Sequence, residues 1–201
     1  MNTKERILNE ALILFSEKGY RDVYVGDIAD AVGIKAPSLY NHFKNKQEIF
    51  DSCVKKFYER MTQVRNDLMV PGTPHAKDSY ETMDLAQITE LAVGLFLFYL
   101  KDDVASRFRR ILMMERYRNP DLNRIYEELF VNGAVEYEEA VFSELIAAGI
   151  IKKENPHIVA LRFYTPIFYL LQKYDMQPER EEDAKKELIS MITEFCETYR
   201  R

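Results

Sequence analysis

Apolar residues recur at the spacing of an α-helix along almost the whole chain, and turn-forming residues interrupt this pattern at only a few points. Of the 201 residues, seven are Gly and seven are Pro, and most of them stand between the apolar stretches. No stretch alternates between apolar and polar residues with a period of two, as a half-buried strand would. The pattern therefore predicts an all-α fold of about nine helices and no sheet.

The first 45 residues predict three short helices. The first covers residues 3–18 and ends at Gly19, and the second covers residues 27–32. Gly33 then supplies a tight turn, and Pro37 fits the first turn of a third helix, where its missing N–H costs nothing. Three short helices with a glycine turn before the third can form a helix-turn-helix.

The third of these segments carries side chains that suit the major groove of DNA, which is about 12 Å wide. Its small apolar residues fit thymine methyl groups, its Ser and Asn side chains can bond base edges, and its Tyr, His and Lys side chains can reach phosphates. These residues are Ala36, Pro37, Ser38, Tyr40, Asn41, His42 and Lys46. Leu39 and Phe43 are expected to pack inward, as they would in a three-helix core with no role in DNA binding.

The charge distribution favours a local contact with nucleic acid. The net charge is −5, which argues against a nucleic-acid partner for the chain as a whole. However, the first 60 residues hold ten Lys and Arg against nine Asp and Glu. No acidic residue lies between Asp30 and Glu48, whereas this window contains Lys35, Lys44 and Lys46. The sequence therefore predicts a small basic patch on an acidic protein.

Three pieces of this region resemble the DNA-binding domain of the tetracycline-repressor (TetR) family. They are Asp27-Ile28-Ala29, Gly33-Ile34, and Ser38-Leu39-Tyr40-Asn41-His42-Phe43-Lys44-Asn45-Lys46-Gln47-Glu48. The Leu-Tyr-x-His-Phe-x-x-Lys core within the last piece is among the more specific short helix-turn-helix signatures. The resemblance covers about a quarter of the chain, and the remainder is similar only in length and in its order of helices.

The resemblance implies an Ω-shaped homodimer in which each subunit places its third helix in a major groove of a palindromic operator. It implies a DNA-binding domain over residues 1–46 and an effector-binding and dimerisation domain over residues 47–201. A small molecule bound to the second domain would swing apart the two DNA-binding domains of the dimer, which we call the reading heads. The positions that match the family's DNA-contacting residues are Val25, Lys35, Ala36, Pro37, Ser38, Tyr40, Asn41, His42 and Lys46.

Two positions depart from the family's pattern. Tyr24 stands near the start of the second helix, where the family often has Thr. Lys35 stands where the family often has Ser, and it cannot cap the third helix as Ser would, although it can contact a phosphate or a base. We therefore expect the operator to be contacted in an unusual way at these two places.

The chain contains thirteen Tyr, twelve Phe and eight Met, a large supply of side chains that can adapt to a ligand. Those at helical spacing are candidates for a pocket that binds a mostly apolar effector, although each could instead fill the core. These candidates are Phe96, Tyr99, Met113, Met114, Tyr117, Phe163, Tyr164 and Phe168. Pro166 should remove one backbone hydrogen bond from its helix and leave a free carbonyl near this cavity or near a dimer interface.

For the dimer interface, the candidates are Tyr169, Phe195 and Tyr199, together with the apolar face of residues 157–173; an intramolecular core is the alternative. Turn signals also predict element boundaries. A loop is expected over residues 70–74, followed by a helix that Asp78 or Ser79 caps and that runs through Leu100. Asn-Pro pairs at 119–120 and 155–156 each predict a helix start, with one long helix between them that ends at Gly149.

Nothing in the sequence points to catalysis, a cofactor or a metal. Glu154 and His157 have the spacing of a metal-binding Glu-x-x-His pair, but Pro156 places a helix start between them and no second copy exists. His42 and His75 lie far from this pair in the sequence, so the histidines form no evident cluster.

We also expect a protein of the cytoplasm with no membrane partner. The N-terminus shows no signal peptide, and Cys53 and Cys196 stand too far apart for a Cys-x-x-Cys motif. The longest apolar run, residues 91–100, is far shorter than the roughly 20 residues that span a bilayer.

The sequence therefore predicts a ligand-responsive transcriptional regulator that acts as a repressor rather than an activator. A small, mostly apolar molecule would release it from its operator. One alternative is a helical protein-interaction adaptor that has lost DNA binding, and another is an enzyme built on a helical scaffold.

Overall fold

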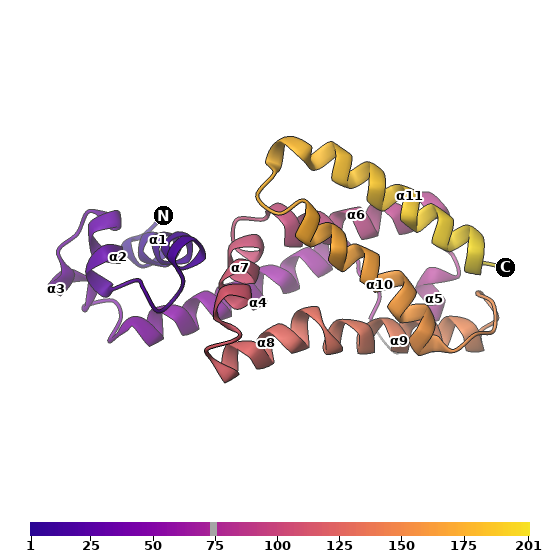
Figure 1. Cartoon of the computed structure of the whole chain (residues 1–201), viewed down its shortest axis with the longest axis horizontal. Helices are drawn as coiled ribbons and strands as arrows, with labels where there is room; N and C mark the ends of the chain where they lie inside the picture. Colours follow the sequence, from indigo (N-terminus) through magenta and orange to yellow (C-terminus); the bar gives the residue numbers. More distant parts are fainter. Residues whose placement is uncertain (73–75) are drawn as a thin grey trace. The chain divides into compact units, whose positions relative to one another are not determined.

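The structure, a computed structural model, describes residues 1–72 and 76–201 (Figure 1). Within these residues it contains helices and no strand, and a single isolated bridge joins Ile151 to Arg200. The all-α prediction is confirmed. The helices are α1 (Thr3–Lys18), α2 (Val25–Val32), α3 (Ala36–Leu39), α4 (Lys46–Asp67), α5 (Ala76–Tyr80), α6 (Leu85–Lys101), α7 (Ala105–Glu115), α8 (Pro120–Phe130), α9 (Asn132–Ala147), α10 (Pro156–Lys173), the short η1 (Pro178–Arg180) and α11 (Glu181–Tyr199).

The chain divides into two compact units. Residues 1–63 and 102–126 form the N-terminal unit, and residues 64–101 and 127–201 form the C-terminal unit. The predicted boundary after Lys46 falls at the first residue of α4, and the N-terminal unit continues beyond it to include α7. The division at residue 46 stays a prediction. Part of the predicted 70–74 loop, together with His75, lies outside the described residues.

The N-terminal helix begins and ends where the sequence predicts. The Asn2 side chain accepts a hydrogen bond from the Glu5 N–H, and the Glu5 carboxylate accepts one from the Asn2 N–H, both at 2.9 Å. This reciprocal cap satisfies two N–H groups that have no partner within the helix. At the other end, Gly19 leaves the helix with a φ of +84°, a conformation that favours glycine.

A small apolar core joins α1, α2 and α3. Ile7, Phe15, Ile28, Leu39 and Phe43 are at most 1% exposed. They come from all three helices and from the turn after α3. Because side chains at helical spacing meet on one face of each helix, this core fixes which faces remain exposed.

Helices α4 and α7 pack together in the same unit. The Phe57 ring of α4 stacks on the Phe108 ring of α7, with 4.6 Å between the ring centroids. Arg60 donates to the Asp102 carboxylate at 2.9 Å. Asp102 also accepts hydrogen bonds from the N–H groups of Val104 and Ala105, at 3.0 and 3.1 Å, and so caps the start of α7.

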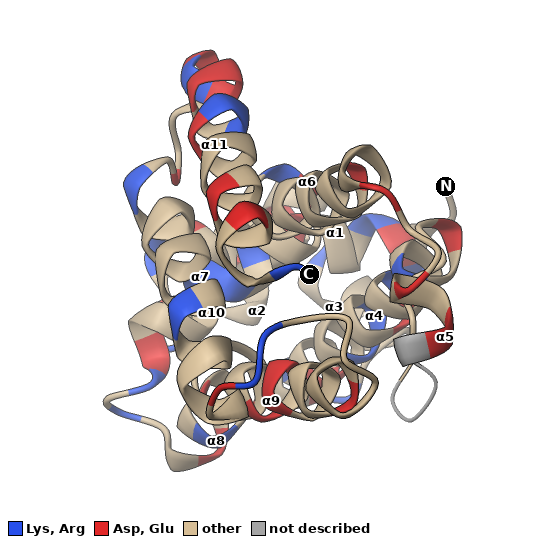
Figure 2. Ribbon diagram, turned by 90° about the vertical axis from the view of Figure 1, so that its right-hand side faces the viewer, with Lys and Arg blue, Asp and Glu red and all other residues tan. Residues whose placement is uncertain are grey.

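In the C-terminal unit, α10 packs against α9 and α11, and α11 also packs against α6 (Figure 1). Acidic residues occupy the first turn of α11 (Figure 2), where the helix dipole stabilises negative charge. Among them, Glu181 accepts hydrogen bonds from Lys101 and Lys185 at 2.7 and 2.8 Å. These bonds hold the pKa of the Glu181 carboxyl below its usual value and tie the end of α6 to α11.

The prediction of one long helix between residues 120 and 149 is wrong, because α8 ends at Phe130 and α9 begins at Asn132. Val131 between them has φ −126° and ψ −90°, which is not helical. A Cβ on Gly133 would stand 2.1 Å from the carbonyl oxygen of Glu128, so the two helices meet at a backbone approach that only glycine allows.

The prediction of one helix from Asp78 to Leu100 also fails. Helix α5 ends at Tyr80, and α6 begins at Leu85. The break has a local cause, because Asp84 and Gln87 cap α6 reciprocally. The Asp84 carboxylate accepts from the Gln87 N–H at 2.8 Å, and the Gln87 side chain accepts from the Asp84 N–H at 2.9 Å. Among the described residues, no helix is both long and apolar enough to cross a bilayer.

Candidate nucleic-acid interface

The third helix, α3, passes directly into a turn, and we call residues 35–44, which include both, the reading segment. Beyond α3, the N–H groups of Asn41, His42 and Phe43 bond the carbonyls of Ser38, Leu39 and Leu39, at 3.3, 2.9 and 3.1 Å. Leu39 and Phe43 both point into the core, as predicted. Most of the remaining side chains of the segment are therefore exposed.

Most of the predicted DNA-contacting residues are exposed on this segment. The exposed set comprises Lys35, Pro37, Ser38, Tyr40, Asn41 and His42, whereas Val25 and Ala36 are half-buried. Tyr40 is 54% exposed, unusually high for a large aromatic side chain in a small domain. An exposed row of hydroxyl, amide, imidazole and ammonium groups on a short helix is suited to a groove of DNA.

The turn between α2 and α3 follows from Gly33. Its φ of +76° and ψ of +35° are left-handed, and its N–H bonds the Asp30 carbonyl at 3.0 Å. Ile34 then donates to the Ala29 carbonyl at 2.9 Å. These bonds close α2 and set the direction in which α3 leaves the turn.

Tyr24 and Lys35, the two positions that depart from the family's pattern, each precede a helix, and neither side chain caps it. Lys35 precedes α3 and makes no side-chain cap, as the sequence predicts. Tyr24 precedes α2 and is 72% exposed, while its backbone N–H donates to the Asp27 carboxylate at 2.7 Å. Both side chains are therefore available at the surface, in or next to the reading segment.

Lys46 lies where a phosphate ligand was predicted, but its ammonium is already bonded. Nζ donates to the carbonyls of Tyr20, Arg21 and Val23 at 2.8, 3.3 and 2.8 Å. An ammonium has three donors, and all three are used inside the chain. Burial lowers the pKa of Lys46, and the nearby carboxylate of Glu115 opposes that shift. We therefore withdraw the phosphate contact and assign Lys46 to holding the loop between α1 and α2.

Lys46→Ala is consequently expected to destabilise the protein by about 1–3 kcal/mol, because three loop carbonyls, two of them in part-buried hydrogen bonds, lose their donor. Urea unfolding followed by circular dichroism measures this change. Lys44→Ala is the matched control: Lys44 is exposed on the reading segment, and its removal is expected to change the free energy of unfolding by less than about 0.5 kcal/mol. Equal unfolding free energies for the two variants would contradict the assignment.

The predicted effector-pocket residues separate into several environments. Phe96 is 2% exposed and fills the core formed with Leu100, Leu170 and Leu188. Tyr99 lies edge-on to Phe130, with 5.4 Å between ring centroids.

The Tyr164 hydroxyl donates to the Phe130 carbonyl at 2.9 Å, and the Phe168 ring lies 6.2 Å from the Tyr164 ring. The structure therefore brings Tyr99 and Tyr164 to Phe130, with Phe168 beside Tyr164.

The three predicted pocket residues near α7 are placed differently. Met113 is half-buried and accepts a hydrogen bond from Arg109 at 3.5 Å. Met114 is 40% exposed and Tyr117 is 86% exposed. The buried face of α7 carries Ile111, Leu112 and Glu115, so the side chain of Met114 falls on the other face. We therefore remove Met114 and Tyr117 from the candidate pocket.

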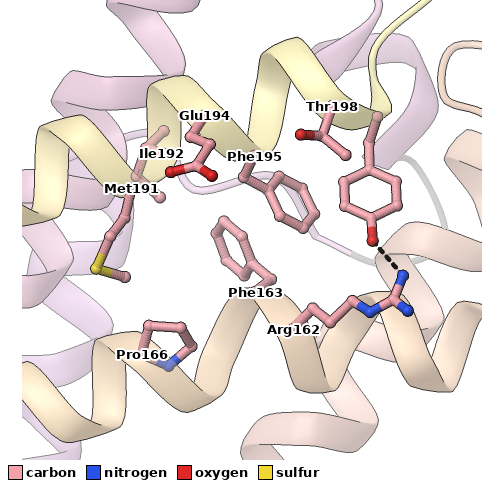
Figure 3. Close-up of a pocket in the computed structure, with 9 residues that line it drawn as sticks. Arg162, Phe163, Pro166, Met191, Ile192, Glu194, Phe195 and Thr198 are labelled. Carbon is pink, nitrogen blue, oxygen red and sulfur yellow. Dashed lines mark hydrogen bonds between the residues drawn. The ribbon is translucent and has the colours of Figure 1, made fainter.

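A groove of about 250 Å³ lies between α10 and α11 (Figure 3). It brings Phe163, predicted for the effector pocket, together with Phe195 and Tyr199, predicted for the dimer interface. Its other lining residues are Arg162, Pro166, Met191, Ile192, Glu194 and Thr198.

Pro166 has no N–H, so the carbonyl of Arg162 one turn earlier loses its helical donor beside the groove, as the sequence suggests.

Tyr199 is used within the subunit. It is 5% exposed, and its hydroxyl accepts a hydrogen bond from the Arg162 guanidinium at 2.5 Å (Figure 3). Its carbonyl accepts from the Lys152 N–H at 2.8 Å. Tyr199 therefore fits the intramolecular alternative better than a dimer contact. Tyr169, by contrast, is 59% exposed on α10.

The 157–173 segment predicted for the dimer interface carries an exposed stripe, of which the sequence analysis named only Tyr169. Ile158, Arg162, Thr165 and Tyr169 are all exposed and repeat at helical spacing, so they share one face. Ile158 could have been recognised by its helical spacing from Tyr169. Among the described residues, no group of three or more His, Cys, Asp or Glu side chains could hold a metal ion.

Comparisons with known proteins find similarity to the N-terminal reading head alone and to the whole chain. Residues 7–53 match the family of bacterial regulatory proteins, tetR family. IcaR of Staphylococcus aureus, a negative transcriptional regulator of the biofilm operon icaADBC, is 27% identical over 198 residues, which cover 96% of this chain and 98% of IcaR. IcaR of Staphylococcus epidermidis is 38% identical over 68 residues, which cover 32% of this chain and 37% of that protein.

Solved structures show the same fold. SmeT, the repressor of the Stenotrophomonas maltophilia multidrug efflux pump SmeDEF, is 19% identical with a TM-score of 0.63, covering 100% of this chain and 92% of SmeT. A SmeT–triclosan complex has a TM-score of 0.67 at 20% identity, covering 100% and 93%. A regulator from Marinobacter aquaeolei VT8 has a TM-score of 0.65 at 22% identity, covering 97% and 91%.

A helix-turn-helix with an exposed reading segment, attached to a helical second unit, defines the chain as a DNA-binding transcriptional regulator. The match of residues 7–53 to the tetR family and the likeness of the whole chain to IcaR support a regulator of the TetR family, in agreement with the resemblance found in the sequence. The chain is a regulator rather than an enzyme, and the comparisons give no support to the adaptor alternative.

Proposed function

We propose that this chain is a homodimeric repressor that binds a palindromic operator and is released by a small, mostly apolar molecule. The observation that carries the proposal is the reading segment. Its polar side chains are exposed, its apolar side chains are buried, and no acidic residue stands between Asp30 and Glu48. The proposed DNA contacts are Val25, Lys35, Ala36, Pro37, Ser38, Tyr40, Asn41 and His42.

A homodimer is supported by the size of the reading segment. One short helix contacts too few base pairs for useful specificity, whereas two helices spaced about 34–36 Å apart read two half-sites. The exposed stripe of α10, together with the groove beside it, is the proposed dimer face. It presents Ile158 and Tyr169, which are 39% and 59% exposed.

For the effector site, we propose the aromatic cluster of the C-terminal unit. Tyr99, Phe130, Tyr164 and Phe168 combine apolar rings with hydroxyl groups, as sites for mostly apolar ligands do. A protein of the same fold, SmeT, has been solved as a complex with triclosan. To weaken operator binding a hundredfold, the effector must favour the released state by about 2.7 kcal/mol.

Selection from a pool of random duplexes, followed by gel shift, tests the proposal. We expect the selected duplex to contain an inverted repeat. Its affinity should fall steeply between 50 and 200 mM salt, by about 10³-fold or more if about six phosphates are contacted. Triclosan is the first effector probe, scored by a thermal shift and then by release of the retarded duplex. Failure to retard any duplex at low salt would refute the proposed function.

A further inference from the structure

The loop between α1 and α2, residues 19–24, is held by two other helices of the N-terminal unit. From α4, Lys46 donates to three of its carbonyl groups. From α7, the Glu115 carboxylate accepts a hydrogen bond from the Arg21 N–H, with 3.4 Å between nitrogen and oxygen. The loop leads directly into α2, and α2 leads through Gly33 into the reading segment. A residue that fixes the position of this loop therefore also fixes the position of the reading head.

Glu115 is unusual because it is a buried carboxylate. The residue is 6% exposed, whereas Glu is almost never fully buried unless it has a partner. Removing a carboxylate from water is costly, so its position needs compensating interactions. Here the compensation comes from the Arg21 N–H of the loop and from the ammonium of Lys46, whose pKa the charge of Glu115 raises.

Gly19 provides the space that this carboxylate occupies. A Cβ added to Gly19 would stand 2.9 Å from Oε1 of Glu115, closer than carbon and oxygen normally approach. Its φ of +84° also favours glycine. The end of α1 and the end of α7 are therefore fitted to each other at this point, with no side chain between them.

Several titratable side chains lie around the same loop and affect one another's pKa values. Burial raises the pKa of the Tyr20 hydroxyl, and the charges of Asp51 and Glu115 act in the same direction. Burial lowers the pKa of Lys46, while the charge of Glu115 opposes that change. Glu115 thus interacts with both Lys46 and Tyr20, and it is the member of this group that α7 contributes.

We propose that Glu115 is a positioning residue for operator reading, which fixes the reading head to α7 and so sets the spacing of the two heads in the dimer. The inference rests on the homodimeric repressor proposed above. Helix α7 is followed by α8, which passes into the C-terminal unit at residue 127. A ligand-dependent shift of α7 would reach the head through this same contact.

The test varies the distance between the half-sites of the operator selected by the wild-type protein. Each inserted base pair moves one half-site by about 3.4 Å and rotates it by about 35°, since one turn holds about 10 base pairs. The wild-type dimer is expected to lose about tenfold or more in affinity when two base pairs are inserted. Glu115→Ala is expected to reduce this preference to about twofold, because its heads are no longer held at one angle.

Three comparisons separate positioning from general damage. The affinity of Glu115→Ala for a duplex with one half-site should stay within about twofold of wild type, because its reading segment is unchanged. Glu115→Gln keeps an oxygen that can accept the Arg21 N–H, and it should restore most of the spacing preference. Glu17→Ala removes an exposed carboxylate from α1 and should leave the preference unchanged.

If Glu115→Ala does not fold, Glu115→Asp replaces it, because it keeps the charge and withdraws the carboxylate by one methylene. The proposal is overturned if the folded variant keeps the wild-type spacing preference, or if it loses the single half-site as strongly as the full operator. A wild-type protein that binds no duplex would instead refute the proposed function.

Discussion

Replacing Tyr40 and Asn41 together by alanine is expected to weaken operator binding about a thousandfold while leaving the folded protein intact. Both side chains are exposed on the reading segment, so their removal opens no cavity. We assign Tyr40 to a phosphate and Asn41 to a base edge, each contributing about 1 kcal/mol or more. Because a dimer makes each contact twice, the loss sums to about 4 kcal/mol, or a factor of about 10³. Gel shift on the selected operator measures it.

Tyr117→Ala is the matched control for this double variant. Tyr117 is a tyrosine of the same unit and is 86% exposed, but it lies outside the reading segment. It should bind the operator as tightly as wild type. Thermal melting should be nearly the same for all three proteins, since exposed substitutions usually change stability by less than about 0.5 kcal/mol. Wild-type affinity in the double variant would show that the reading face lies elsewhere.

The reading head could be predicted in detail because its signals are local. Gly19 and Gly33 mark positions with positive φ, and the apolar spacing around Leu39 separates buried from exposed side chains. Each of these signals depends on residues within a few positions of one another. Local backbone preference and side-chain period are the two properties that a sequence displays directly.

The role of Lys46 could not be predicted in this way. Its spacing in the motif is compatible with a phosphate contact, and its charge favours one. The carbonyls that it bonds belong to residues 20–23, more than twenty positions earlier in the chain. Glu115 and Arg21 are 94 positions apart. Such contacts depend on how the helices pack, and no residue pattern within either segment indicates that packing.

The residues predicted for the effector pocket show a related limit. Phe96, Phe163 and Tyr117 all recur at helical spacing, yet one fills the core, one lines a groove and one is exposed. Helical period distinguishes one face of a helix from another, but it does not say whether a face meets a neighbour, a ligand or solvent. The break at Val131 is different, because the Asn-Gly pair that follows it is a readable signal of interruption within a helical pattern.

Tyr169→Arg is expected to weaken the dimer about a hundredfold or more. Tyr169 is 59% exposed in the single chain and lies on the α10 stripe with Ile158, next to the groove lined by Phe163 and Phe195. In a symmetric interface this change buries two unpaired charges, each of which costs several kcal/mol.

Sedimentation at several protein concentrations should therefore show monomer where the wild type is dimer, and operator affinity should fall in parallel. Met114→Arg places the same charge on an exposed residue of α7 and should leave the dimer intact. If Tyr169→Arg sediments as the wild-type dimer, the two subunits meet through another face, and the groove between α10 and α11 is open to a different occupant.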